Sequence, residues 1–407
     1  MAKKFFRTHR IFHRFEFLYF SYYTFIMSNM LDYMAWRGDL TFSASPLNEI
    51  DVLVFCQITY LNFDGILENG NFKTALSLSE LAERFRKSPD FKKRSDVGVL
   101  INQGTSDVLF AAAETERYKD VKITGLVSIT DIEKEEQFAA LTYVFAPKKN
   151  CVVYRGTDDT IVGFKEDFNL AIMDEVPAQK DSVSYVENVA KNLKGDIFLV
   201  GHSKGGNLSV FAAAMCQKET KRRIKSVYNM DGPGFSEKRI QSNEFYEVIP
   251  KLHSYYPHFS IVGMIFSHAG KYSVVDSDQS GILQHDPLSW HIKGNHFELR
   301  EDFDEAAVFF TDTLNKWILS LSREQQVQFI ETLYKILQST EAKTNSEIES
   351  NLFKNYFTIW KSWKNTDAEI RKNVEETVRQ LFKIAHKQMP SLTELLEKKS
   401  IFKKVKN

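Results

Sequence analysis

The spacing of hydrophobic residues changes along the chain, and each change indicates a different kind of secondary structure. Apolar residues recur at intervals near 3.6 in the stretch NEIDVLVFCQITYL, and residues 72–88 are amphipathic, so both segments are predicted to be helical. Between residues 118 and 156, three runs rich in β-branched and aromatic residues follow one another: VKITGLVSITD, FAALTYVFA and NCVVYRG. These runs predict three strands.

Helix and strand patterns alternate from residue 182 onward. A helix is expected at 182–193, and a buried strand at DIFLV, which the helical stretch GNLSVFAAA follows. Three more strands are expected at RIKSVYNM, KLHSYYPH and KYSVVDS. Strands that alternate with helices are typical of a mostly parallel sheet covered by helices. The predicted fold class is therefore α/β.

Residues 301–407 differ from the rest because long amphipathic helices dominate them. The stretches EAAVFFTDTLNKWILSLSREQQVQFIETLYKILQ and NVEETVRQLFKIAHKQ carry apolar stripes at helical spacing. Such stripes usually pack against other helices, and the alternative is a face that binds a partner protein. We therefore predict a helical C-terminal extension over 301–407, which follows a globular domain over 27–300.

The first 26 residues, MAKKFFRTHRIFHRFEFLYFSYYTFI, form a basic and aromatic tail. Its longest uncharged run is too short to span a bilayer, and no small-residue cleavage site follows it. Two interpretations stay open: the tail lies on a membrane surface, or Met27 begins the native chain and the tail is an upstream extension. Because no signal peptide is recognised, the expected location is the cytoplasm, with peripheral membrane contact left open.

The composition narrows the classes of function. Lys plus Arg equals Asp plus Glu at 53 each, so no charge excess indicates nucleic acid or an acidic partner. Cys56, Cys151 and Cys216 lie far apart without a CxxC pair, which favours a reducing compartment and argues against a structural zinc site. Cys151 and Cys216 have apolar neighbours and are predicted to be core residues.

The pentapeptide Gly201-His202-Ser203-Lys204-Gly205 carries the main functional signal. It has the form G-x-S-x-G and lies between the strand DIFLV and the helix GNLSVFAAA. In a nucleophile elbow, the serine occupies a tight strand-to-helix turn, the flanking glycines let strand and helix approach, and the hydroxyl projects from the sheet edge. We therefore predict that Ser203 is a nucleophile, in preference to an incidental serine in a glycine-rich turn.

A serine nucleophile needs a general base, and in this fold class the chain order is serine, acid, histidine. His285 is the predicted base, because its stretch QHDPLSW forms a loop after the last expected strand. His296 is the second choice. His253 and His258 flank a Tyr-Tyr-Pro stretch and are expected to be structural.

The acid that orients the base is expected at the same edge of the sheet. Asp231 is the preferred candidate, because it ends the strand that directly follows the elbow helix. Asp276, Asp278 and Asp286 are the alternatives. Asp286 is disfavoured, because a residue adjacent to its partner usually points away from it.

Residues 151–170, CVVYRGTDDTIVGFKEDFNL, are similar to the strand and loop of class 3, fungal-type lipases, in which an apolar strand leads into Arg-Gly-Thr/Ser and an Asp-containing stretch. Together with VGHSKGGNLS, their order and spacing resemble that α/β-hydrolase family. The set NMLDYMAWRGDL, VGHSKGGNL, NMDGPGF and QHDPLSW resembles more closely an uncharacterised bacterial lipase-like family allied to it. The resemblance covers residues 27–300 and implies an α/β-hydrolase fold there.

The resemblance implies roles for four residues. Ser203 matches the nucleophile, and His285 matches the region of the catalytic histidine. Thr157, after Arg-Gly, matches the residue whose backbone N–H and hydroxyl line the oxyanion hole. The backbone N–H of Lys204 would be the second oxyanion donor.

The chain departs from class 3 lipases at the acid. Where those lipases carry D-x-V-P, this chain reads FSIVG, with Ser260 in place of the aspartate. The acid has then either moved one strand earlier, to Asp231, or the triad is weakened. We also expect Arg155 and Asp167 to pair and to shape the oxyanion loop.

These features together predict a serine hydrolase that cleaves small-molecule or lipid esters through a Ser-His-Asp triad and an acyl-enzyme, without metal or cofactor. A thioesterase, a peptidase and an acyltransferase would use the same residues. The alternative from another class is a non-catalytic interaction protein on a hydrolase scaffold. Pocket walls are expected from loops and from residues 72–118, which could form a partial lid.

Overall fold

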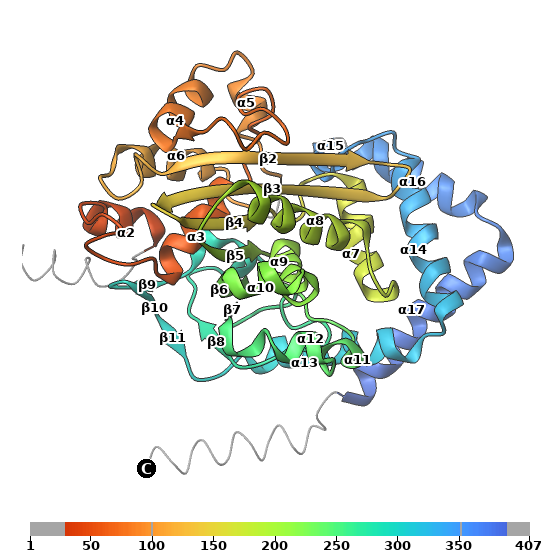
Figure 1. Cartoon of the computed structure of the whole chain (residues 1–407). Helices are drawn as coiled ribbons and strands as arrows, with labels where there is room; N and C mark the ends of the chain where they lie inside the picture. The colour runs from red at the N-terminus through yellow and green to blue at the C-terminus, as the bar shows by residue number, and fades with distance from the viewer. Residues whose placement is uncertain (1–28, 99–100, 351, 389–407) are drawn as a thin grey trace, which may run out of the picture.

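The computed structural model describes residues 29–98, 101–350 and 352–388. Its centre is a nine-stranded sheet (Figure 1) with the order β1-β2-β3-β4-β5-β6-β7-β8-β11. Strands β4 to β8 run parallel, whereas β1 to β4 and the pair β8–β11 are antiparallel. The strands are β1 (Leu76–Ser77), β2 (Lys122–Asp131), β3 (Glu136–Ala146), β4 (Lys149–Tyr154), β5 (Asp196–His202), β6 (Ile224–Met230), β7 (Leu252–Pro257), β8 (Tyr272–Val275) and β11 (Leu299–Arg300).

The strands expected from the hydrophobic pattern are confirmed. Helices cover the two faces of the sheet, and a short hairpin of β9 (Ile292–Lys293) and β10 (His296–Phe297) lies outside it. The arrangement is that of an α/β-hydrolase fold with a helical C-terminal region. The helices before that region are α2 (Met30–Arg37), α3 (Glu49–Ile58), α4 (Leu78–Arg86), α5 (Phe91–Arg94), α6 (Thr105–Glu114), α7 (Ile161–Ile172), α8 (Pro177–Asn192), α9 (Lys204–Met215), α10 (Lys218–Arg223), α11 (Glu237–Ile240) and α12 (Asn243–Tyr246).

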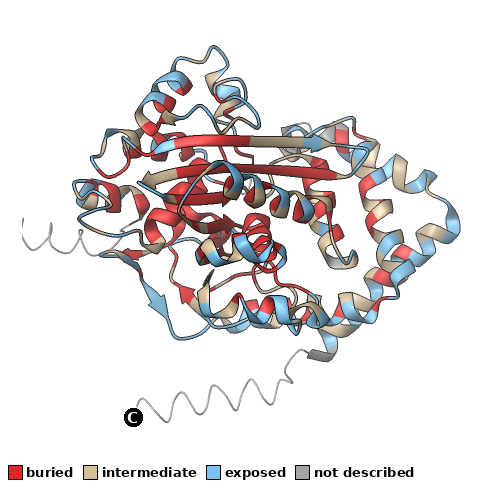
Figure 2. Cartoon of the chain, in the orientation of Figure 1, coloured by how far each residue is buried: buried red, intermediate tan, exposed pale blue. Residues whose placement is uncertain are grey.

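Two hydrophobic cores lie on opposite faces of the sheet, and β4 contributes to both. Cys151 and Val153 pack with α2, α3, α4 and α6, whereas Val152 and Tyr154 pack with α8 and α9. Side chains alternate between the faces of a strand, so a strand covered on both sides is apolar throughout. Figure 2 shows the resulting buried strands at the centre of the molecule. The core positions expected for Cys151 and Cys216 are confirmed.

Two predicted helix boundaries are wrong. The helix expected from residue 72 begins at Leu78, because Ser77 caps it in a capping box with Glu80 and residues 76–77 belong to β1. The helix expected from residue 182 begins five residues earlier, at Pro177, a residue type that fits the first turn of a helix.

The C-terminal region is helical, as expected. It contains α13 (Glu305–Ser320), α14 (Arg323–Gln338), α15 (Asn345–Ser350), α16 (Leu352–Asn365) and α17 (Ala368–Gln388). Ser322 caps α14 and so divides the long apolar pattern of residues 305–338 into two helices. Both α13 and α14 pack against α17, and α14 also packs against α7 (Figure 1).

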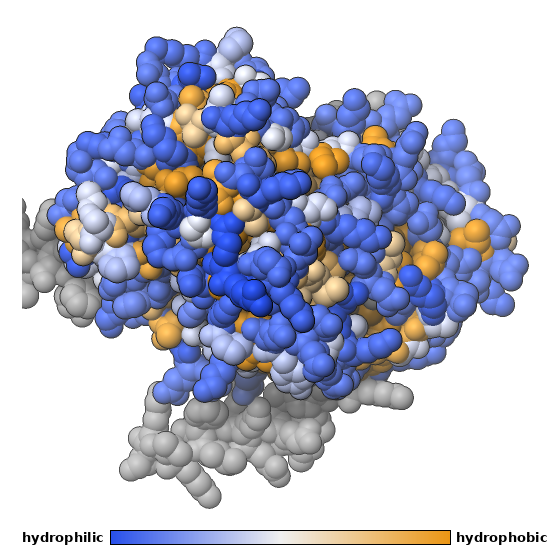
Figure 3. Space-filling model, in the orientation of Figure 1, coloured by the Kyte–Doolittle hydropathy of each residue, from blue (hydrophilic) through white to orange (hydrophobic). Residues whose placement is uncertain are grey.

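The surface is mainly polar on the face that Figure 3 shows, where hydrophobic residues are scattered among hydrophilic ones. Among the helices of the described ranges, none is both long and apolar enough to cross a membrane. The tail over residues 1–26 and the basic end of the chain after residue 388 lie outside the described residues, so the two interpretations of the tail stay predictions.

A buried ion pair anchors α3 against the loop that precedes β2. Arg117 donates to both carboxylate oxygens of Asp51, at 2.6 and 2.5 Å, and Tyr118 Oη donates to Asp51 at 2.6 Å. Asp51 is fully buried. Removal of one partner from such a pair leaves a buried charge without compensation.

We expect Asp51→Ala to lower the free energy of unfolding by about 3–5 kcal/mol. Denaturant unfolding followed by circular dichroism measures this change. Glu83→Ala, which removes an exposed ion pair with Lys87, is the control and should leave the midpoint almost unchanged. Equal midpoints for the two variants would contradict the role assigned to Asp51.

Candidate active site

Ser203 lies in the turn between β5 and α9, with φ 58° and ψ −132°. A non-glycine residue at positive φ is strained, and such strain is characteristic of a nucleophile elbow. A Cβ atom on Gly201 would overlap the backbone of Gly205, and one on Gly205 would overlap the carbonyl oxygen of Tyr154. Both glycines are therefore needed for the close approach of strand and helix.

The predicted base and the preferred acid lie together. His285 Nδ1 and Asp231 Oδ2 are 2.6 Å apart, and both side chains are buried. Asp231 follows β6 directly and has φ 51°, so the chain turns sharply at the point where this carboxylate is presented. The pair holds the Nδ1 side of the imidazole ring and leaves Nε2 as the ring nitrogen available for proton transfer.

Ser260 contacts that same carboxylate. Its hydroxyl donates to Asp231 Oδ1, the oxygen that does not bind His285. A Cβ atom on Gly263 would overlap Asp231 Oδ1, so the backbone also packs closely there. The carboxylate of Asp231 is thus held by His285 on one oxygen and by Ser260 on the other.

A hydrogen-bonded chain that the sequence did not reveal supports the backbone of His285. His202 Nε2 lies 2.8 Å from the carbonyl oxygen of His285, and His202 Nδ1 lies 2.7 Å from Tyr60 Oη. Burial lowers the pKa of His202 well below its usual value, so the ring is neutral. Because a carbonyl only accepts, Nε2 carries the proton and Nδ1 accepts from Tyr60. His202 adjoins Ser203 in the sequence, but no local pattern indicates its link to Tyr60.

Ser203, His285, Thr157 and Lys204 line one cavity of about 310 Å³. Within the described ranges, Ser203 Oγ makes no hydrogen bond to the His285 ring, although both groups face the same space. Catalytic hydrogen bonds are often long before substrate binds, so this geometry is compatible with an active site. Residues 97, 98 and 101 also line the cavity, in agreement with the wall expected from 72–118.

The Arg-Gly-Thr stretch lies against the elbow. A Cβ atom on Gly156 would come within 3.0 Å of the Cβ of Ser203, so the backbone passes close to the nucleophile. The hydroxyl of Thr157 donates to the carboxyl of Asp167 and lies 2.7 Å from each of its oxygens, so it is already engaged within the protein. The expected Arg155–Asp167 pair is wrong, because Arg155 instead binds Asp158 at 3.1 Å within the same turn.

The side chain of Lys204 makes contacts that the sequence did not show. Its ammonium is buried and donates to the carbonyl and side-chain oxygens of Gln137, at 2.7 and 2.8 Å, and to Glu166 at 2.9 Å. The side chain is thus fully engaged by β3 and α7. This contact fixes the first turn of α9, whose positive end faces the cavity.

The residues that were the alternative candidates for the catalytic base and acid make other contacts. His296 is exposed and pairs with Glu49 at 2.7 Å. Asp278 is exposed, and Asp286 accepts from the backbone N–H of residue 102, at 3.3 Å. Burial raises the pKa of Asp286 to about 6. His253 stacks on a tyrosine, Tyr228, and His258 binds Asp304, which fits the structural roles expected for both histidines.

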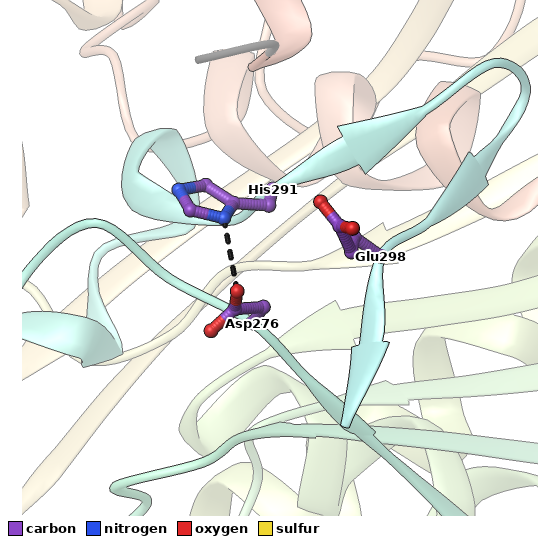
Figure 4. Close-up of side chains that lie close together, drawn as sticks. All are labelled: Asp276, His291 and Glu298. Carbon is purple, nitrogen blue, oxygen red and sulfur yellow. Dashed lines mark hydrogen bonds and ion pairs between the residues drawn. The ribbon is translucent and has the colours of Figure 1, made fainter. Parts of the chain in front are cut away.

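Asp276, His291 and Glu298 form a separate cluster whose ligand atoms lie within 4.8 Å of one another (Figure 4). Its charges already have partners in the protein. Asp276 binds His291 Nδ1 at 3.3 Å and lies 3.7 Å from Arg300, and Glu298 lies 4.0 Å from Lys293. These contacts account for the cluster as a network of ion pairs, and we assign no metal to it.

Comparison with known proteins places this site in context. A family model described as Mbeg1-like matches residues 112–335, which include Thr157, Ser203, Asp231 and His285 and extend into α14. A search of curated proteins finds no match. A solved structure titled "Crystal structure of M37 lipase" is similar at 14% identity, with a TM-score of 0.31, over 53% of this chain and 68% of that chain.

The carboxyl of Asp167 makes the stability of the site dependent on pH. Burial raises its pKa to about 6, from an ordinary value near 3.8. A group with a raised folded-state pKa stabilises the fold below its unfolded pKa and loses that contribution as the pH rises through the folded value. The loss should therefore occur between about pH 4 and pH 6.

We expect Asp167→Asn to gain stability relative to the wild type as the pH rises from 4.5 to 7, because the amide does not ionise. Denaturant unfolding of both proteins at the two pH values measures the difference. A difference that is the same at both pH values would contradict a buried, titrating Asp167.

Proposed function

The chain belongs to the Mbeg1-like family, a lipase-like family, and we propose that it is a serine hydrolase that cleaves carboxylic esters. One observation carries the proposal: a serine on a strained strand-to-helix turn shares a cavity with a histidine that is bound to a buried carboxylate. A serine that lay in a turn by chance would need neither the strained backbone of Ser203 nor the hydrogen-bonded His285–Asp231 pair.

In the proposed mechanism, Ser203 Oγ attacks the carbonyl carbon of the ester while His285 Nε2 takes the hydroxyl proton. Asp231 holds Nδ1–H and stabilises the imidazolium that forms. The tetrahedral intermediate collapses, the bond to the alcohol breaks, and His285 returns the proton to the leaving oxygen. Water, activated by His285, then cleaves the acyl-enzyme and releases the acid and the free serine.

The backbone N–H groups of Thr157 and Lys204 would hold the negative oxygen of the intermediate. Lys204 is the first residue of α9, a position where the helix itself supplies no acceptor for the N–H. Gly156 packs against Ser203, so the adjoining Thr157 backbone lies near the reacting carbon. The two proposed oxyanion donors and the three side chains of the proposed triad all belong to this one chain.

Thioesters and acyl transfer would use the same acyl-enzyme, and the site geometry does not separate them from esters. We propose ester hydrolysis because water, which accepts the acyl group in that reaction, requires no further binding site. A non-catalytic interaction protein would retain the fold without needing the Asp231–His285 pair.

We expect Ser203→Ala to abolish hydrolysis of p-nitrophenyl esters and Asp231→Asn to lower kcat by about 10⁴-fold, because the amide favours the wrong tautomer of the histidine. Release of p-nitrophenol measures both effects.

The matched control is Asp276→Asn, which changes a carboxylate that also binds a histidine, His291, but lies outside the cavity. It should retain wild-type activity. Activity that survives Ser203→Ala, or that is lost equally in both aspartate variants, would contradict the proposed triad.

A further inference from the structure

We propose that the acyl group of the substrate is a long apolar chain and that the C-terminal helices α13 and α14 form one wall of its binding site. The proposal rests on the proposed function and names the class of ester that the site accepts. It also assigns a role to helices whose apolar stripes were expected to pack against other helices or, alternatively, to bind a partner protein.

One face of α13 lines the cavity that contains Ser203. Leu314, Trp317, Ile318 and Leu321 have the spacing of a single helical face, and all four line this cavity. Phe329 and Ile330 of α14 continue the same wall. An apolar stripe that would otherwise pack against protein therefore faces a space that opens onto the nucleophile.

The wall on the catalytic side is also apolar. Phe164 and Phe168 of α7 and the loop residues Val262, Ile265 and Phe266 line it. The lining contains three carboxylates: Asp158 binds Arg155, Asp167 binds Thr157, and Asp159 Oδ2 accepts from the N–H of Ser346, whereas Asp159 Oδ1 is buried without a partner among the described residues. Most of the lining is apolar, so a hydrocarbon chain is the group that fits between these walls at the lowest desolvation cost.

Polar contacts join the C-terminal helices to the two loops that frame the cavity. On one loop, Asn345 N–H donates to the carbonyl of Asp159 at 2.9 Å, and Ile161 N–H donates to that of Lys343 at 3.0 Å. On the other, Asn315 accepts from the N–H of Phe266 at 3.0 Å and donates to the carbonyl of Met264 at 3.1 Å.

The contacts of Asn315 fix α13, and those of Lys343 and Asn345 fix the segment that follows α14, so the wall is formed before substrate binds. The volume of about 310 Å³ lies at the lower end of the range of ligand sites, about 300–1,000 Å³. An unfilled apolar cavity destabilises a fold, because its lining side chains lose packing contacts. A bound hydrocarbon chain would restore those contacts.

Burial of each additional methylene should raise kcat/KM by up to about fourfold until the cavity is filled. The test compares p-nitrophenyl esters from acetate to palmitate. We expect wild-type kcat/KM to rise with chain length, and Ile318→Trp to abolish the gain from acetate to long chains. The matched control is Leu319→Trp, since the neighbouring Leu319 is 82% exposed and does not line the cavity.

A binding measurement separates this proposal from the catalytic one. Ser203→Ala should bind a fluorescent 16-carbon fatty acid, and Ile318→Trp in that background should weaken binding at least tenfold, whereas Leu319→Trp should not. A flat chain-length profile in an active enzyme, or equal binding by the two tryptophan variants, would overturn the acyl site. Binding without hydrolysis of any ester would instead overturn the proposed function and retain the apolar-chain site.

Discussion

The buried carboxylate of Asp231 is the constraint on which the candidate site depends. A carboxylate removed from water needs hydrogen-bond donors, and this one receives them from His285 Nδ1 and Ser260 Oγ. These partners lie in loops that follow two further strands, β7 and β8, so a single carboxylate joins three loops at one sheet edge. The same edge holds Ser203, because parallel strands bring their carboxyl ends together. Removal of this side chain would leave His285 Nδ1 and Ser260 Oγ without the acceptor that they share.

Much of the fold and part of the site could be predicted from local patterns. The strands β2 to β8 follow from runs of β-branched and aromatic residues, because strand burial imposes a pattern on neighbouring residues. Ser203 could be placed on a turn because the glycines that a strand-to-helix elbow requires flank it. Asp231 and His285 could be selected as candidates because the ends of successive strands share a sheet edge.

Other features depend on contacts that no local pattern encodes. Arg155 was expected to bind Asp167, but the turn brings Asp158 closer and the hydroxyl of Thr157 occupies Asp167. The link between Tyr60 and His202 joins residues 142 positions apart through the packing of α3. The apolar stripe on α13 predicted a helix, but it could not show what the stripe faces. The same spacing of apolar residues occurs where a helix packs into a core and where it lines a cavity.

The central claim is that Ser203 is an activated nucleophile, and a fluorophosphonate probe tests it most directly. Such a probe forms a covalent bond only with a serine whose proton a base removes and whose oxyanion donors hold the phosphonyl oxygen. The folded protein should be labelled stoichiometrically, with the adduct mapped by mass spectrometry to the peptide that contains Ser203. Folded protein that remains unlabelled, or an adduct on another residue, would contradict the account.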